Sequence, residues 1–204
     1  MNPVIISAAA GKKHTREIAP LEQSFYDYNW EQNTVFYTIK SSDNSWRGRD
    51  LKTNFANIIK NIGDNIPVYW IDSDSYAIDS FKPFDFQDYD MLCNSQGPVT
   101  ENNHYINFRK FDAVRHLFTE NTSMICSWFL AFSSGKIAKK FCYEWWKLYQ
   151  ELYEKYQCIS DEPSLSLIVR DSGLKFGPIP LSANWIINDC LFHHHSKNLK
   201  YRGK

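Results

Sequence analysis

The sequence predicts an α/β protein in which helices cover a central β-sheet. Short apolar segments of strand length alternate with longer segments of helical periodicity, and this alternation is typical of that fold class. The chain has 204 residues, of which 43% are hydrophobic and 16% aromatic, so we expect one domain with a sizeable core. Its 23 basic and 23 acidic residues balance, which argues against binding nucleic acid through a broad basic face.

The sequence also argues against membrane-spanning and disulfide-linked proteins. No apolar run approaches the roughly 20 residues that span a bilayer, and residues 4–10 lack the basic lead-in of a signal peptide. The five cysteines are odd in number and widely spaced, with no C-x-x-C motif. We therefore expect a cytoplasmic protein with reduced thiols, no membrane span and no nucleic-acid partner.

Apolar segments in the first half of the chain are expected to form strands. They are rich in aliphatic, aromatic or β-branched residues, and they comprise residues 3–10, 34–39 and 67–71. The last of them, PVYWI, is apolar on both faces, which indicates a strand in the middle of the sheet. Helices are expected over residues 19–28 and 51–61, the first after a polar loop that begins at Gly11.

The second half of the chain is expected to continue the alternation. Strands are predicted at residues 89–93 and 127–132, with a mixed helix over residues 107–118 between them. The clearest helix carries apolar residues spaced by three and four: Ile137, Phe141, Trp145, Leu148, Leu152 and Tyr156. A further helix over residues 162–169 follows Ser160-Asp161-Glu162-Pro163, where an N-cap residue precedes a proline in the first turn.

Asp72-Ser73-Asp74 follows the predicted central strand directly. Two carboxylates that leave a buried strand together repel each other, and oxygen ligands of this kind suit Mg²⁺ or Mn²⁺. The carboxyl end of a central strand is also where open α/β sheets bind ligands. The other D-x-D, Asp88-Tyr89-Asp90, leads into a strand, and we interpret it as a solvated turn.

Asp161 and Glu162 open a predicted helix, and two interpretations compete there. One is structural, because an acidic residue caps the helix or complements the positive end of its dipole. The other is functional, with a carboxylate aimed into a cleft as a general base or as an acceptor for sugar hydroxyls.

The C-terminal segment combines histidines with basic residues. His193, His194 and His195 are followed by a basic cluster formed by Lys197, Lys200, Arg202 and Lys204. A neutral imidazole can complete a metal site that two aspartates begin, and the basic cluster suits a diphosphate. The competing interpretation is a solvated tail. Neither G-x-G-x-x-G nor a P-loop motif occurs, so a nucleotide would be held by carboxylate-bound metal and loops.

The order of these segments resembles that of the GT-A glycosyltransferases, which use nucleotide-diphosphate sugars, and in particular small viral or bacterial glycan-building enzymes. On the donor side, the family's nucleotide-binding strand, its lysine before the metal motif and its D-x-D resemble, in turn, Pro3-Val-Ile-Ile-Ser-Ala-Ala-Ala10, Trp46-Arg-Gly-Arg-Asp-Leu-Lys52 and Val68-Tyr-Trp-Ile-Asp-Ser-Asp74. On the acceptor side, its strand, its tryptophan-bearing helix and its D-E-x-x-L resemble Ser127-Trp-Phe-Leu-Ala-Phe-Ser-Ser134, the segment with Trp145, and Asp161-Glu-Pro-Ser-Leu165. Its LP-x-x-x-N and its H-x-x-G-x-x-K ending resemble Pro180-Leu-Ser-Ala-Asn184, and His194 with Lys200.

The resemblance implies a GT-A-like, Rossmann-like fold with a mixed, mostly parallel central sheet. It implies one domain over residues 1–204, with a nucleotide-sugar-binding half at 1–95, an acceptor-side half at 96–192 and a basic tail at 193–204 that binds metal and diphosphate. Since the chain is near the minimum length of such a domain, we also consider that it is one domain of a larger protein.

The implied activity is metal-dependent transfer of a sugar, of the hexosyltransferase type. The donor would be a nucleotide-diphosphate sugar, with a UDP-sugar favoured, and the acceptor a glycan or glycoprotein. The cofactor would be Mn²⁺ or Mg²⁺, bound by Asp72, Asp74 and His194. Lys197 stands where the family's ending usually has glycine, so the choice among His193, His194 and His195 stays open.

The resemblance also assigns roles to individual residues. Asp161 and Glu162 would be catalytic, and Trp128 and Trp185 are candidates for stacking on sugars or for core packing. The implied donor-binding residues are Ala8, Ala9, Ala10, Lys13, Arg16, Lys52, Asp72, Ser73 and Lys200.

Two alternatives are weighed against this interpretation. Residues 9–21 faintly echo the opening motif of sugar-nucleotide pyrophosphorylases, but His14 stands at the motif's second glycine and would hinder the backbone from wrapping a triphosphate. The other alternative is a carbohydrate-binding module that kept the fold but lost turnover. The complete set of Asp72, Asp74, Asp161, Glu162 and a histidine argues against it.

Overall fold

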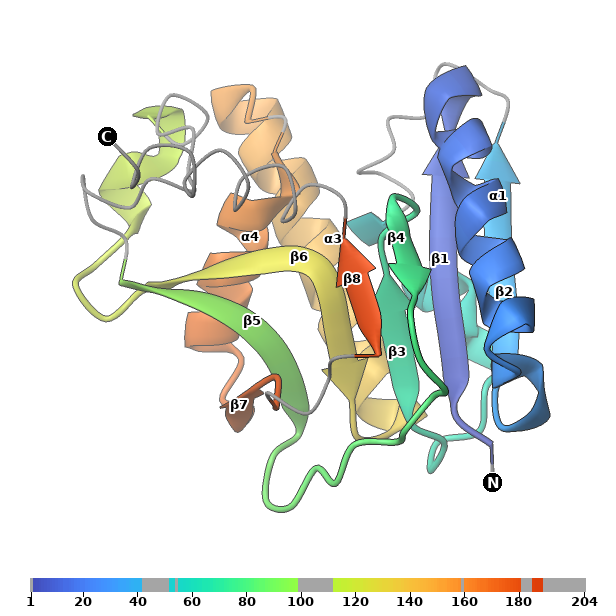
Figure 1. The fold of residues 1–204 in the computed structure, drawn as a ribbon. Helices are drawn as coiled ribbons and strands as arrows, with labels where there is room; N and C mark the ends of the chain where they lie inside the picture. The colour runs from blue at the N-terminus through green and yellow to red at the C-terminus, as the bar shows by residue number, and fades with distance from the viewer. Residues whose placement is uncertain are drawn as a thin grey trace, which may run out of the picture.

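A six-stranded sheet runs through the part of the chain that the structure describes (Figure 1). The structure is a computed structural model and describes residues 2–41, 52–53, 55–98, 112–158, 160–180 and 185–188. The strands of the sheet are β1 (Val4–Ala10), β2 (Val35–Ser41), β3 (Val68–Ile71), β5 (Met91–Pro98), β6 (Ser123–Phe132) and β7 (Phe176–Pro178). A separate two-stranded sheet pairs β4 (Ser75–Ala77) with β8 (Ile186–Asn188).

The strand order is β2-β1-β3-β6-β5-β7, which places β3 in the interior of the sheet. β1 runs parallel to β2 and β3, and β5 runs parallel to β7, whereas β6 runs antiparallel to β3 and β5. All residues of β3 are buried, as the apolar segment PVYWI predicts for a central strand. The predicted α/β class with a mixed, mostly parallel sheet is therefore confirmed.

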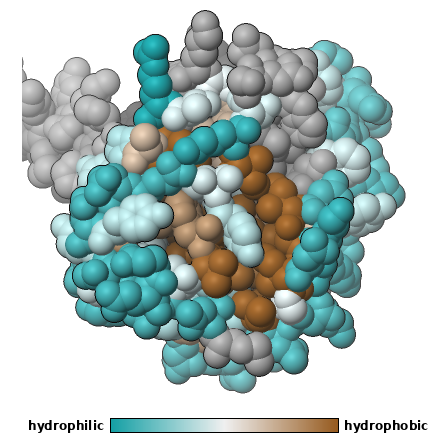
Figure 2. All heavy atoms as spheres, turned by 90° about the vertical axis from the view of Figure 1, so that its right-hand side faces the viewer, coloured by the Kyte–Doolittle hydropathy of each residue, from teal (hydrophilic) through white to brown (hydrophobic). Residues whose placement is uncertain are grey.

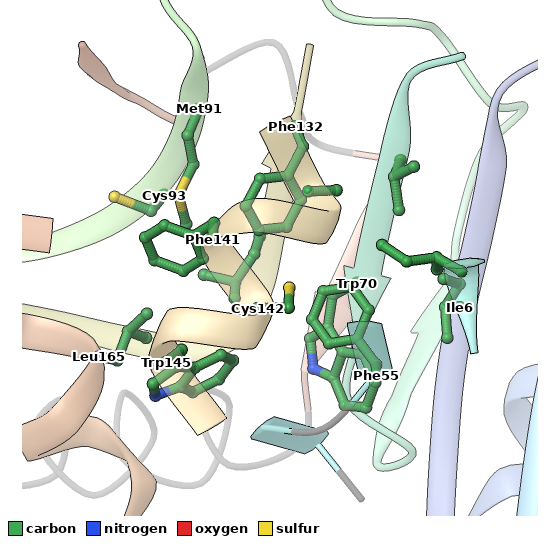
Figure 3. Packing of buried hydrophobic residues seen from close by; sticks show 14 of the residues in the cluster. Ile6, Phe55, Trp70, Met91, Cys93, Phe132, Phe141, Cys142, Trp145 and Leu165 are labelled. Atoms are coloured by element: carbon green, nitrogen blue, oxygen red, sulfur yellow. The ribbon is translucent and has the colours of Figure 1, made fainter. Parts of the chain in front are cut away.

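Helices and turns cover both faces of the sheet. On one face lie α3 (Gly135–Tyr156), α4 (Asp161–Asp171) and the 3₁₀ turns η2 (Phe55–Asn57) and η3 (Ile59–Asn61). Figure 3 shows how their aromatic side chains meet those of the strands, with Phe55 stacked on Trp70 at a ring distance of 5.1 Å. The other face is covered by α1 (Gly11–Asp27), the turn η1 (Trp30–Gln32) and the β4–β8 pair.

The helix α1 begins earlier than the sequence predicts. Residues 11–18 are helical, where a polar loop is expected. Only Ile18, Leu21 and Phe25 of α1 are buried apolar residues, so the polar first turns lack the periodicity that would reveal them. The hydroxyl of Thr15 donates to the carbonyl of Gly11 over 2.8 Å within these turns.

Two other predicted helices are shorter in the structure. The described part of residues 51–61 forms a helical pair at 52–53 followed by η2 and η3, although its apolar residues face the core as expected. Residues 112–117 of the predicted helix at 107–118 form a 3₁₀ turn, η5 (Asp112–Leu117), and residues 107–111 lie outside the described residues. Strands β7 and β8 lie in the segment after Gly173 that is expected to be loop.

The side of the molecule that carries α1 and β2 has a patch of hydrophobic residues bordered by hydrophilic ones (Figure 2). On β2, the outer strand of the described sheet, Val35 and Tyr37 are exposed. In the part of the chain that the structure describes, no helix is both long and apolar enough to cross a membrane. Cys93, Cys126, Cys142 and Cys158 are free thiols, as predicted, and Cys190 lies outside the described residues.

Candidate active site

The site is built around Asp72, which follows the last residue of β3. Its backbone N–H donates to the carbonyl of Trp128 on β6 over 2.8 Å. The indole N–H of Trp70, two residues earlier on β3, donates to Asp72 Oδ1 over 3.0 Å. Because Trp70 is itself stacked on Phe55 of η2, the core holds the Asp72 carboxylate in one orientation at the carboxyl end of the central strand.

Lys52 joins this carboxylate to a second one. Its ammonium lies 2.7 Å from Oδ1 and 2.8 Å from Oδ2 of Asp72, and 3.4 Å from Oδ2 of Asp161. It also donates to the hydroxyl of Ser127 on β6 over 2.9 Å. The Lys52 side chain is only 13% exposed, so these contacts replace much of the water that an ammonium normally binds. Residues far apart in the sequence thus meet in one buried ionic cluster.

Asp161 is held at the first turn of α4. The side chain of Ser164 donates to the Asp161 carbonyl over 2.8 Å, and the indole N–H of Trp145 on α3 donates to Ser164 Oγ over 2.9 Å. Ser160 occupies the N-cap position as predicted, but its side chain makes no capping hydrogen bond. The Asp161 carboxylate is buried at the positive end of the α4 dipole, which favours its ionised form.

Glu162 extends the acidic cluster toward β6. The thiol of Cys126 is a weak donor 4.0 Å from Glu162 Oε1. Burial, and next the negative charge of Glu162, raise the pKa of the Cys126 thiol to about 12. Cys126 therefore stays a neutral thiol at physiological pH and adds no charge to the site.

The charges in the cluster shift the pKa values of Lys52 and Asp72. Burial alone would lower the pKa of Lys52, but the carboxylates of Asp161 and Asp72 outweigh it and raise that pKa above its ordinary value. Burial raises the pKa of Asp72, and the charges of Asp74 and Asp161 add to this effect while Lys52 opposes it. Asp161, Asp72 and Glu162 thus act on the Lys52 ammonium through their charges, and Asp74 and Asp161 act on Asp72 in the same way.

The predicted metal ligands are only partly described. Asp72 and Asp74 follow β3, while His194 lies outside the described residues. Within the described residues, no group of three or more histidine, cysteine, aspartate or glutamate side chains is arranged to hold a metal ion.

The other predicted donor-binding residues lie at the ends of β1 and β3, on α1 and in the C-terminal segment. Ala8, Ala9 and Ala10 form the carboxyl end of β1, beside β3, and Ser73 is buried in the turn after Asp72. Lys13 and Arg16 lie on the first turns of α1, with the Arg16 side chain exposed. Lys200 lies outside the described residues. Of the tryptophans considered for sugar stacking, Trp185 is fully buried in the core, while Trp128 is half-buried.

The sequence analysis missed three supporting residues. Trp70 on β3 contacts Asp72, Cys126 on β6 contacts Glu162, and Ser127 on β6 contacts Lys52. The sequence does contain a signal for Ser127 and Trp70. A hydroxyl or an indole N–H in an otherwise apolar strand needs a hydrogen-bond partner. The identity of those partners depends on how β3 and β6 pair.

The comparisons with known proteins identify the fold. Neither a protein-family model nor a curated protein sequence matches the chain. Among solved structures, a glycosyltransferase involved in glycosylation of the major capsid of PBCV-1 aligns over 92% of this chain and 93% of its own, with a TM-score of 0.52 and 13% identity. The galactosyltransferase LgtC, solved with donor and acceptor sugar analogues, aligns over 85% and 73%, with a TM-score of 0.50 and 14% identity. This chain has a GT-A-like glycosyltransferase fold.

The same fold occurs in a longer protein. The glycosyltransferase GlyE of Streptococcus pneumoniae TIGR4 aligns over 98% of this chain but only 50% of its own, with a TM-score of 0.58 and 11% identity. In the GT-A-like fold of this chain, the carboxyl end of β3 and the start of α4 converge on Lys52. The predicted fold is therefore confirmed, and its acidic cluster lies at the sheet edge where α/β proteins bind ligands.

Proposed function

We propose that this protein is a metal-dependent glycosyltransferase that moves a sugar from a nucleotide-diphosphate donor, with a UDP-sugar favoured, to a hydroxyl group of a glycan. The observation that carries the proposal is the Lys52 ammonium, which joins Asp72 of the D-x-D to Asp161 of the D-E-x-x-L in one buried cluster. The residues expected on the donor side and on the acceptor side of the reaction thus meet in one place. The glycosyltransferase fold of the chain supports the same activity.

The residues present fit a divalent cation. Asp72 and Asp74 supply the carboxylate oxygens that Mn²⁺ and Mg²⁺ prefer, and their charges interact after the end of β3. His194 is proposed to complete the ligand set from the C-terminal tail. A cation bound there would act as a Lewis acid that stabilises charge on the departing nucleoside diphosphate.

The acceptor side of the site is assigned to α4. Asp161 and Glu162 are proposed to hold sugar hydroxyls or to accept the proton of the acceptor hydroxyl, with Asp161 nearer to the transferred sugar. Lys52 helps to orient the Asp161 carboxylate, because its ammonium lies 3.4 Å away and attracts negative charge. Trp145 and Ser164 hold the backbone of Asp161, so that the core of α3 determines its position.

A ligand screen tests the proposal. Melting temperatures are measured with UDP-, GDP- and dTDP-sugars, each with and without Mn²⁺, because a ligand that binds the native state raises the melting temperature by mass action. We expect a rise that requires both Mn²⁺ and a nucleotide sugar, largest for UDP-sugars. Release of nucleoside diphosphate from the stabilising donor then measures turnover. The absence of any metal-dependent shift across the panel contradicts the proposal.

Replacement of Asp74 by asparagine is expected to weaken Mn²⁺-dependent donor binding by at least about 100-fold. Replacing a residue that only hydrogen-bonds to a metal ligand already lowers metal affinity by up to about that factor. Asp74 lies in a turn outside the core, so the fold should persist. Titration calorimetry with the stabilising donor and Mn²⁺ measures the effect. Asp88→Asn, in the exposed second D-x-D, is the matched control and should bind normally. Unchanged metal dependence in Asp74→Asn would remove this residue from the metal site.

Deletion of residues 193–204 is expected to weaken donor binding by about 10- to 100-fold, because charge-assisted hydrogen bonds to the diphosphate are lost. The melting temperature without ligand should change little. A shorter deletion, of residues 201–204, keeps the histidines and Lys200 and serves as the control. Normal donor affinity in the longer deletion would show that the tail is solvated and has no part in the site.

A further inference from the structure

The indole N–H of Trp128 is buried and has no hydrogen-bond acceptor among the described residues. A buried donor left in this state is costly, and such groups in native proteins call for an explanation. Other indoles of the chain are paired: those of Trp30, Trp70 and Trp145 donate to Asp79 O, Asp72 Oδ1 and Ser164 Oγ over 2.8, 3.0 and 2.9 Å. Trp128 therefore differs from these three tryptophans, whose indole N–H groups all have acceptors within the protein.

Trp128 lies at the junction of the two halves of the site. Its carbonyl accepts the backbone N–H of Asp72, and its neighbour Ser127 accepts a hydrogen bond from Lys52. Its ring packs only at the margin of the aromatic core, 5.5 Å from that of Phe129, and the residue as a whole is half-buried. The unpaired N–H thus belongs to a residue beside Asp72 and Lys52, where the fold brings Asp161 close.

We propose that the Trp128 indole N–H donates a hydrogen bond to a hydroxyl oxygen of the sugar part of the donor. This inference rests on the proposed function. The transferred sugar must lie between the donor-binding and the acceptor-binding residues. The Trp128 backbone is hydrogen-bonded to Asp72, and Lys52 links Asp72 to Asp161 at the same place. A neutral N–H suits a hydroxyl oxygen, while the cationic groups of the site suit the diphosphate. Trp128 then contributes to recognition of the sugar and not of the nucleotide.

The test compares binding of a nucleotide with binding of its sugar conjugates. Titration calorimetry in Mn²⁺ measures the affinities of wild-type protein and Trp128→Phe for UDP, UDP-glucose, UDP-galactose and UDP-N-acetylglucosamine. We expect Trp128→Phe to bind UDP as the wild type does. Its affinity for the preferred UDP-sugar should fall by about three- to tenfold, the size of one lost hydrogen bond.

Trp30→Phe is the matched control, since its indole is fully buried and bonded to Asp79 O. It should lower the melting temperature of the free protein more than Trp128→Phe does, and it should leave the preference for the UDP-sugar over UDP unchanged. An unchanged sugar preference in Trp128→Phe, or an equal loss of affinity for UDP and UDP-sugar, overturns the inference. Wild-type protein that binds none of the four ligands contradicts the UDP-sugar preference of the proposed function, and the inference falls with it.

Discussion

Lys52→Met is expected to destabilise the fold by about 3 kcal/mol, because it removes the cation beside the buried Asp161 and the partly buried Asp72 carboxylates. The Lys52 ammonium lies within 3.4 Å of both Asp72 and Asp161, and the Asp161 side chain is only 8% exposed. Methionine keeps most of the side-chain volume, so the loss of stability measures the contribution of the Lys52 charge and its hydrogen bonds. Urea unfolding monitored by circular dichroism measures the change in the free energy of unfolding.

The control for this variant is Lys40→Met, which breaks an ion pair with Glu22 at the surface. Exposed pairs of this kind contribute about 0.2–1 kcal/mol, so the two lysines should differ clearly. The double variant Lys52→Met/Asp161→Asn should regain part of the lost stability, since it removes the buried Asp161 charge that Lys52 no longer offsets. If Lys52→Met were as stable as the wild type, the ionic cluster would have no structural role.

Asp161→Asn is expected to reduce turnover by about 10²- to 10⁴-fold, the range for loss of a positioned acid–base group. Glu162→Gln should have a smaller effect, because Asp161 lies 3.4 Å from Lys52 and is joined through it to Asp72. Both replacements keep the shape of the side chain and remove its charge. The rate of sugar transfer from the donor identified by the ligand screen is measured for each, beside its melting temperature.

These two variants separate catalysis from helix stabilisation. Removing a charge that only complements the helix dipole costs stability and leaves the rate unchanged, whereas a catalytic carboxylate gives the opposite pattern. Asp171→Asn, at the other end of α4, tests charge removal on the same helix away from the cluster and should keep full activity. Loss of stability without loss of rate in both Asp161→Asn and Glu162→Gln would make the pair structural.

Local sequence patterns predicted the helices and strands that are determined by residues close together in the sequence. Residues 67–71 are apolar on both faces, and they form the buried strand β3 in the interior of the sheet. The apolar spacing in residues 137–156 predicted α3, and Ser160-Asp161-Glu162-Pro163 marked the start of α4. The start of α1 was missed because its first turns carry few core residues. The prediction over residues 51–61 identified the residues that face the core but not the 3₁₀ geometry of the turns.

The sequence by itself determined the fold class, the position of Asp72 at a strand end and that of Asp161 at a helix start, since each depends on neighbours within a few residues. Only the tertiary structure decided that Lys52 lies between these two carboxylates and that Ser127 and Trp70 support them. Those contacts depend on the pairing of β3 with β6 and on the packing of α4 against the sheet. The energy of a buried charge depends on which opposite charge lies within a few ångströms, and residues distant in the sequence supply that charge here.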